Sequence, residues 1–158
     1  TGRTPYQGRF LGTSVNDKEA VSRAFSLTKA NRLKDKKFAI LSGGEKQKIV
    51  IARAVAQTTP WMLLDEPIAS LDIKNQIEIM QTLLELNRQE GVSVLMVLHD
   101  INLAGIYCDR LIMLKDGQVI AAGNTNECLC EENLKKLYDI SFFHMDTKKG
   151  QRYYYAEI

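Results

Sequence analysis

The sequence predicts an α/β fold in which a mainly parallel sheet is flanked by helices. Two apolar runs, residues 61–64 and 92–98, are too short for helices and end in polar residues, so each is expected to be a buried strand. Residues 73–90 lie between them and are expected to form a helix whose core side carries Ile77, Met80, Leu83 and Leu84. Strands that alternate with helices form parallel sheets, and such sheets bind ligands at the carboxyl ends of their strands.

Composition excludes several classes of protein. The chain has 158 residues, of which 45% are hydrophobic and 25% charged, as expected of a globular domain. The net charge of +2 is too small to indicate a nucleic acid or an anionic lipid as partner. No apolar stretch reaches the ~18 residues that span a bilayer, so we expect membrane association to come through a partner protein. Cys108, Cys128 and Cys130 lack zinc-like spacing and are expected to be reduced thiols.

The first third of the chain is expected to be mostly helical. Asn16 and Asp17 precede an apolar pattern and predict a capped helix that ends near residue 27, followed by a short helical stretch over residues 28–33. Ser42 is a good N-cap for a helix that runs through Gln57. Gly43 and Gly44 would let backbone N–H groups approach an anion at this helix N-terminus, which suits phosphate. A basic cluster is expected to be solvated surface: Arg32, Lys34, Lys36 and Lys37.

Acidic residues and a histidine follow the two predicted strands. Asp65 and Glu66 come directly after residues 61–64, where one carboxylate can hold Mg²⁺ and its neighbour can orient and deprotonate a water molecule. His99 and Asp100 follow the second strand. Because the carboxyl ends of parallel strands meet at one edge, these side chains are candidates for one site.

The C-terminal part is predicted to contain packing elements without assigned chemistry. A helix over residues 101–107 leads into a hairpin whose turn is Asp116-Gly117, and the final strand includes Tyr153 to Tyr155. Two short helices are expected within residues 125–139. His144 is interpreted as a surface or packing residue.

Three blocks in this order resemble the motifs of an ATP-binding-cassette (ABC) ATPase. Residues 41–47 (LSGGEKQ) resemble the signature motif, residues 61–72 the Walker B strand with its D-loop, and residues 98–100 the switch histidine. The resemblance covers about residues 1–125 and implies part of a P-loop NTPase fold with a helical subdomain before the signature motif. It divides the chain into residues 1–58 (the segment after the glutamine loop, helical subdomain and signature helix), 59–124 (the Walker B, D-loop and switch core) and 125–158 (a C-terminal extension).

The resemblance also assigns roles in a site for ATP and Mg²⁺. It implies that Asp65 binds the metal, Glu66 is the general base and His99 contacts the γ-phosphate. The residues implied to serve the nucleotide held by the opposite subunit are Ser42, Gly43, Gly44, Gln47 and Asp72. The sequence departs from the family at Lys46-Gln47-Lys48, where the family commonly has R-Q-R, and at Ile68, where it usually has threonine or serine.

Residues 2–6 (GRTPY) resemble a G-R-x-P-aromatic stretch of importer ATPases for iron–siderophores, haem and cobalamin. The implied function is ATP hydrolysis that drives such uptake, at the cytoplasmic face of the bacterial membrane. The implied partners are a second ATPase subunit, permease subunits and, indirectly, a substrate-binding protein, with no nucleic acid. Alternatives are another cargo, such as zinc, manganese or an amino acid, and an ABC ATPase of DNA repair or translation.

The sequence contains no G-x-x-x-x-G-K-[ST] motif. We therefore expect it to be the C-terminal part of a cassette, inactive alone and without tight ATP binding. An alternative is a non-catalytic interaction fragment. Apolar strand faces left bare are expected to favour self-association.

Overall fold

The computed structural model describes residues 2–3, 14–148 and 150–157. The chain divides into two units, Thr1–Val97 and Leu98–Ile158, each described by itself below. The three-part division implied by the family resemblance stays a prediction. None of the helices among the described residues has the length and apolar character needed to cross a membrane.

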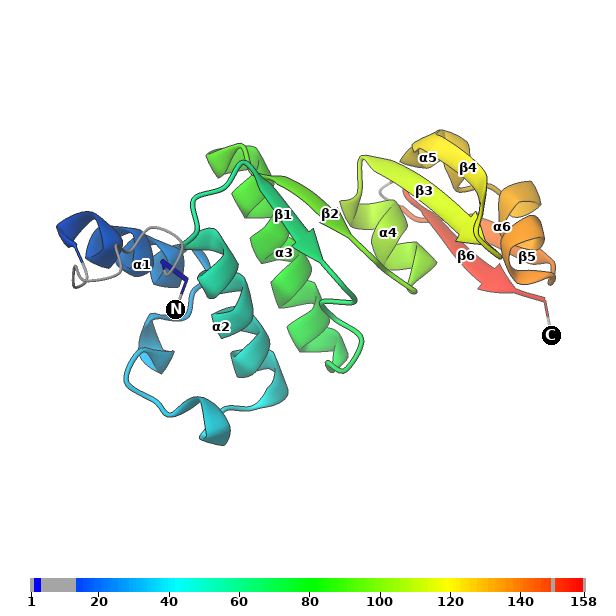
Figure 1. Cartoon of the computed structure of the whole chain (residues 1–158). Coiled ribbons are helices and arrows are strands. Elements are labelled where there is room, and N and C mark those ends of the chain that lie inside the picture. The colour runs from blue at the N-terminus through cyan, green and yellow to red at the C-terminus, as the bar shows by residue number, and fades with distance from the viewer. Residues whose placement is uncertain (1, 4–13, 149, 158) are drawn as a thin grey trace. The chain divides into compact units, whose positions relative to one another are not determined.

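In the part of the first unit that the structure describes, four helical segments precede the strands (Figure 1). They are α1 (Val15–Leu27), the 3-10 helices η2 (Asn31–Leu33) and η3 (Phe38–Ile40), and α2 (Gly43–Val55). Strand β1 (Trp61–Leu64), helix α3 (Ile73–Glu90) and strand β2 (Ser93–Met96) follow. The predicted elements are present. Helix α2 ends two residues before the predicted Gln57, and of the stretch 28–33 only η2 is helical. The predicted basic surface is confirmed, because Arg32, Lys34, Lys36 and Lys37 are exposed.

Helix α1 is capped by Ser14, so the prediction of a cap at Asn16 and Asp17 was wrong by a few residues. The Ser14 hydroxyl accepts a hydrogen bond from the Asp17 backbone N–H at 3.1 Å. The Asp17 carboxylate in turn accepts one from the Ser14 N–H at 3.0 Å. This reciprocal pair is a capping box, which satisfies two donors and places Asp17 inside the first turn of the helix.

Arg3 holds the start of the chain on α1 and on the end of α2. Its Nε donates to Asp17 Oδ1 at 2.8 Å, and its Nη1 donates to the Thr58 hydroxyl at 3.1 Å. A Cβ on Gly2 would lie 2.7 Å from the Arg53 carbonyl oxygen, so only glycine fits there. The first two residues of the GRTPY stretch therefore have a packing role, and residues 4–6 lie outside the described residues.

The Arg3–Asp17 pair predicts a pH-dependent stability. The Arg3 side chain, together with the Ser14 N–H, holds the pKa of Asp17 below its ordinary value. A carboxyl group whose pKa is lowered by folding stabilises the folded state above its unfolded pKa of about 4 and loses that contribution as the pH falls through the folded pKa. Asp17→Asn is therefore expected to lower the urea midpoint at pH 7 and to match the wild type at about pH 2 to 3. Glu19→Gln, an exposed change on the same helix, serves as control, and an equal deficit at both pH values would contradict the assignment.

Strands β1 and β2 pair in parallel and lie against α3 (Figure 1). The register joins Trp61 to Ser93 and Leu64 to Met96. The core side of α3 is formed by Ile79, Met80, Leu83 and Leu86. The predicted stripe of Ile77, Met80, Leu83 and Leu84 was right for Met80 and Leu83. Ile77 is 37% exposed, because the buried stripe runs through Ile79 and Leu86, seven residues apart, rather than through Ile77.

The apolar side chains on the other face of this strand pair are exposed. Met62 is buried toward α3, whereas Trp61 and Leu63 are 61% and 73% exposed. On the neighbouring strand Leu95 is 55% exposed, and Val97 just beyond it is 48% exposed. The expectation of buried strands is therefore wrong for one face, whereas the expectation that apolar strand faces are left bare is confirmed. We call Trp61, Leu63, Leu95 and Val97 the open face.

The open face predicts self-association of the chain as given, because contiguous exposed apolar side chains drive contacts between molecules. We expect light scattering to detect oligomers, and we expect the chain to bind an apolar fluorescent dye. Leu63→Lys should reduce both, since Leu63 lies opposite Leu95 in the register. Val15→Lys is the matched control, because Val15 is also 72% exposed but lies on α1. A monomer without dye binding would refute this prediction.

The second unit begins with α4 (Ile101–Tyr107) and a hairpin of β3 (Arg110–Lys115) and β4 (Gln118–Asn124). The predicted Asp-Gly turn is confirmed, since Asp116 and Gly117 have φ of 50° and 75°, as a two-residue type I′ turn requires. Two short helices follow as predicted, α5 (Thr125–Cys128) and α6 (Glu131–Tyr138). The tail is an antiparallel hairpin of β5 (Phe142–Asp146) and β6 (Arg152–Ala156), of which only the second strand was predicted.

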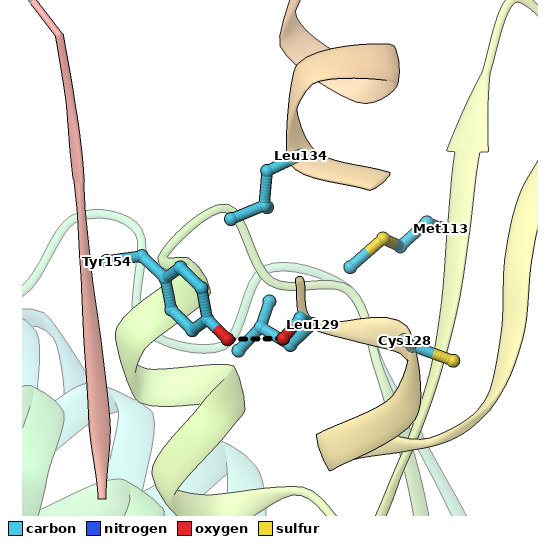
Figure 2. Packing of buried hydrophobic residues seen from close by; sticks show 5 residues of the cluster. All are labelled: Met113, Cys128, Leu129, Leu134 and Tyr154. Carbon is cyan, nitrogen blue, oxygen red and sulfur yellow. Dashed lines mark hydrogen bonds between the residues drawn. The ribbon is translucent and has the colours of Figure 1, made fainter. Parts of the chain in front are cut away.

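The core of the second unit lies between these helices and strands. Figure 2 shows its buried members, which are Met113, Cys128, Leu129, Leu134 and Tyr154. Cys108, Cys128 and Cys130 are free thiols, as predicted, and burial raises the pKa of Cys108 to about 11. His144 lies at the surface, with Nδ1 2.8 Å from Glu131 Oε1.

Candidate functional site

The signature segment forms the N-terminus of α2 as predicted. Ser42 is the N-cap, and its hydroxyl accepts a hydrogen bond from the Glu45 N–H at 3.3 Å. The Glu45 carboxylate accepts a hydrogen bond from the Ser42 N–H at 3.0 Å. This bond, together with the Lys36 side chain, holds the pKa of Glu45 below its ordinary value. The local S-x-x-E pattern is thus a capping box, which fixes where the helix begins. Gln47 lies one turn further on and is half-buried.

The two glycines of this segment have different surroundings. Gly43 is exposed, and a Cβ there would meet only Leu71 Cδ2 at 3.7 Å, an ordinary contact. Gly44 is buried, and a Cβ there would lie 2.3 Å from Asn75 Oδ1. Gly44 therefore leaves room for the Asn75 side chain between α2 and the first turn of α3, and a Cβ would displace that side chain. Gly43 leaves backbone accessible at the helix N-terminus.

The D-loop ends in a cap on α3. Asp72 accepts hydrogen bonds from the Asn75 backbone N–H and from Asn75 Nδ2, each at 2.8 Å. These bonds, the backbone one above all, hold the pKa of Asp72 below its ordinary value. Because Asn75 also lies against Gly44, the D-loop and the signature segment share one side chain. The sequence reasoning missed Asn75; its place three residues after Asp72 in a capping pattern was the only available signal.

A partly buried ion pair joins α2 to α3 further along. Lys48 Nζ lies 2.6 Å from Glu78 Oε2, and only 11% of the lysine side chain is exposed. The Lys48 ammonium group is the main reason that the pKa of Glu78 is lowered. Lys48 is one of the two lysines that replace the family's arginines, so here this position has a packing partner within the chain.

The acidic pair lies at the tip of β1, as predicted. Asp65 and Glu66 are both exposed, and the chain then turns back through a hydrogen bond from the Ala69 N–H to the Glu66 carbonyl. Glu66 has φ of 43°, in the left-handed region. A side-chain-bearing residue in this region costs about 1–2 kcal/mol, and such strain is concentrated at functional sites. Ile68, where the family usually has threonine or serine, is buried at 5% exposure.

The histidine candidate belongs to the second unit. His99 and Asp100 are exposed and precede α4. Asp100 is the N-cap of that helix and accepts hydrogen bonds from the Asn102 and Leu103 N–H groups at 2.8 and 2.9 Å. His99 lines a shallow, open depression of the surface together with Tyr138 and residues of β6. Within the first unit the structure thus brings the signature segment and Asp72 together. Asp65 and Glu66 follow directly after β1, and His99 belongs to the second unit.

Comparison with known proteins shows which proteins the chain resembles. A family model described as ABC transporter matches residues 4–69, which include the signature segment and the β1 tip. The ferric enterobactin transport ATP-binding protein FepC of Escherichia coli (strain K12) is 39% identical over 92% of this chain and 54% of its own length. By sequence the chain is similar to the ATP-binding proteins of ABC transporters. The probable siderophore transport system ATP-binding protein YusV of Bacillus subtilis (strain 168) is 40% identical over 89% of this chain and 51% of its own length.

Solved structures confirm the ABC ATPase fold. A transporter assigned to the metal-chelate type, in an inward-facing conformation, matches 99% of this chain and 64% of its own with a TM-score of 0.93 and 26% identity. The dimeric bacterial ABC transporter cassette MJ0796 matches 77% of this chain and 52% of its own with a TM-score of 0.63 and 34% identity. The chain spans about half the length of the curated relatives it matches.

The chemistry of Asp65 is compatible with a magnesium site that is completed by phosphate. Among the described residues, no group of three or more histidine, cysteine, aspartate or glutamate side chains could hold a metal ion. Mg²⁺ in phosphoryl-transfer sites is held by one or two carboxylates together with phosphate oxygens and water. Asp65, exposed at a strand tip, has the chemistry of such a single carboxylate ligand.

Proposed function

We propose that the protein is the ATP-binding subunit of an ABC importer and hydrolyses ATP to drive uptake of an iron chelate, haem or cobalamin. The observation that carries this proposal is the similarity of 38–40% identity over 87–92% of this chain to ATP-binding proteins named for ferric enterobactin, siderophore and cobalamin transport. The metal-chelate type transporter that matches 99% of the chain supports it.

In the proposed mechanism the exposed acids at the β1 tip act on the nucleotide and on water. Asp65 would hold Mg²⁺, which supplies charge neutralisation to the phosphates when bound. Glu66 would orient the attacking water and take its proton, and the imidazole of His99 would donate a hydrogen bond to the γ-phosphate. The backbone at Gly43 is accessible for a phosphate at the N-terminus of α2.

The same proposal places a partner at the signature segment. Ser42, Gly43, Gly44, Gln47 and Asp72 would serve the nucleotide bound by a second ATPase subunit. The sharing of Asn75 between Gly44 and Asp72 supports this, because it makes the two segments one surface. Permease subunits would bind the ATPase pair at the cytoplasmic face of the membrane, and a substrate-binding protein would select the cargo.

Calorimetry with ATP and Mg²⁺ tests the proposal. The chain as given is compared with a version that includes any coding sequence upstream of Thr1. We expect tight binding and turnover only in the longer version, because the present sequence has no phosphate-cradling G-x-x-x-x-G-K-[ST] loop. Tight binding by the chain alone would reveal a different phosphate site and overturn the roles of Asp65, Glu66 and His99. Uptake assays with a ferric siderophore, haem and cobalamin then separate the cargoes.

A further inference from the structure

Asn102, in the first turn of α4, forms a two-point hydrogen bond with the backbone of Tyr154 in β6. Its Nδ2 donates to the Tyr154 carbonyl oxygen at 3.0 Å, and its Oδ1 accepts from the Tyr154 N–H at 2.7 Å. A side-chain amide offers the same donor and acceptor as a peptide group, so it pairs with β6 as a further strand would. Two parallel bonds fix both the distance and the rotation of α4 relative to β6.

The β6 end of this pair is itself fixed to the core of the second unit. Tyr154 is only 3% exposed, and its hydroxyl donates to the Leu129 carbonyl (Figure 2). The ring lies among Met113, Cys128 and Leu134. The hairpin of β5 and β6, to which the family resemblance assigned no role, is therefore a rigid support for the first turn of α4.

On the α4 side of this pair, the first turn of the helix is close in sequence to His99. Asp100 caps the helix through the N–H groups of Asn102 and Leu103, and His99 is the residue before this cap. Helix α4 has only seven residues, and so short a helix is marginal without tertiary contacts. His99 and Asn102 line the same shallow surface depression, together with Tyr155 and Ala156 of β6 and with Tyr138.

We propose that Asn102 is a positioning residue for His99, and that the C-terminal hairpin is the platform on which it acts. The pair with Tyr154 holds the first turn of α4, that turn holds the Asp100 cap, and the cap sets the direction in which His99 is presented. The inference rests on the proposed function, because it assigns Asn102 to the group that would contact the γ-phosphate.

Nuclear magnetic resonance on the chain as given tests the positioning directly. Asn102→Ala is expected to speed hydrogen exchange of the Tyr154 amide at least about tenfold and to broaden or shift the His99 ring signals. Asn133→Ala is the matched control, since Asn133 Nδ2 also donates to a backbone carbonyl of this unit, that of Cys128 at 2.8 Å, but from α6. It should leave both signals unchanged. His99 signals that stay unchanged in Asn102→Ala, while Tyr154 loses protection, would overturn the proposal.

Kinetics in the version that hydrolyses ATP provide the second test. Asn102→Ala is expected to lower kcat by about ten- to a hundredfold, the range that misplacement of a reacting group by about 1 Å can reach, with KM for ATP within about twofold. In a His99→Ala background the same change should have no further effect, because a residue that acts through His99 has nothing left to position. An additive effect would overturn the proposal. Absence of turnover in the wild type would instead refute the proposed function, and the resonance test would still decide the positioning.

Discussion

Glu66→Gln in the version that hydrolyses ATP is expected to lower kcat by about 10²- to 10⁴-fold, the usual contribution of a general base. Glutamine has the size of glutamate but cannot accept a proton from water. It also keeps the same preference against the left-handed backbone at φ of 43°, so the loop strain is unchanged, whereas glycine would relax it. ATP binding is expected to persist, because Asp65 and the nucleotide contacts remain. Phosphate release under saturating ATP, together with calorimetric ATP binding, measures the two effects separately.

The control for this change is Glu85→Gln on α3, which removes a carboxylate that pairs with Lys29 in the same unit. Its turnover should equal that of the wild type. If Glu66→Gln also hydrolyses ATP at the wild-type rate, Glu66 is not the base and the adjacent Asp65 must be reconsidered. If it loses ATP binding as well, the residue serves the nucleotide rather than the water.

Local chemistry explains which elements were predictable. The start of α2 followed from Ser42, and the structure adds its capping box with Glu45. The helix over residues 73–90 ends at Gly91, which has φ of 67° as a left-handed helix cap requires. The cap of α1 was misplaced because Ser14 and Asn16 are both good caps, and only the reciprocal bond with Asp17 decides between them. Strand β5 was missed because exposed residues such as His144 and Asp146 obscure its alternation.

The tertiary contacts of the candidate site could not be predicted from the sequence. The order of the motifs was sufficient to place Asp65, Glu66 and His99 after their strands. Nothing in the sequence pairs Asn75 with Gly44, 31 positions away, or Asn102 with Tyr154, because these contacts depend on how helices and strands pack. The left-handed backbone of Glu66 could not be predicted either, because the residue before a proline normally favours an extended conformation.

Neighbouring glycines are expected to respond in opposite ways to the addition of one methyl group. Gly44→Ala would place a Cβ 2.3 Å from Asn75 Oδ1 and 2.5 Å from its Cγ. The Asn75 side chain can turn away only by giving up the hydrogen bond from its Nδ2 to Asp72. We expect the free energy of unfolding to fall by about 1–3 kcal/mol, the usual cost of overpacking. Gly43→Ala is the control and should be neutral or stabilising by up to about 1 kcal/mol, since alanine favours the helix and has room there.

The double variant Gly44→Ala with Asn75→Ala decides whether the contact itself is responsible. Removing the Asn75 amide removes the obstacle, so the double variant should be less destabilised than the sum of the two single ones, with a coupling of about 0.5–3 kcal/mol. Urea denaturation of all four variants measures this cycle on the chain as given. Strict additivity would mean that α2 moves as a whole when Gly44 is changed. Strong coupling would mean that Asn75 transmits a displacement of the signature segment to Asp72. The two segments would then move together, as expected if they face a partner subunit as one surface.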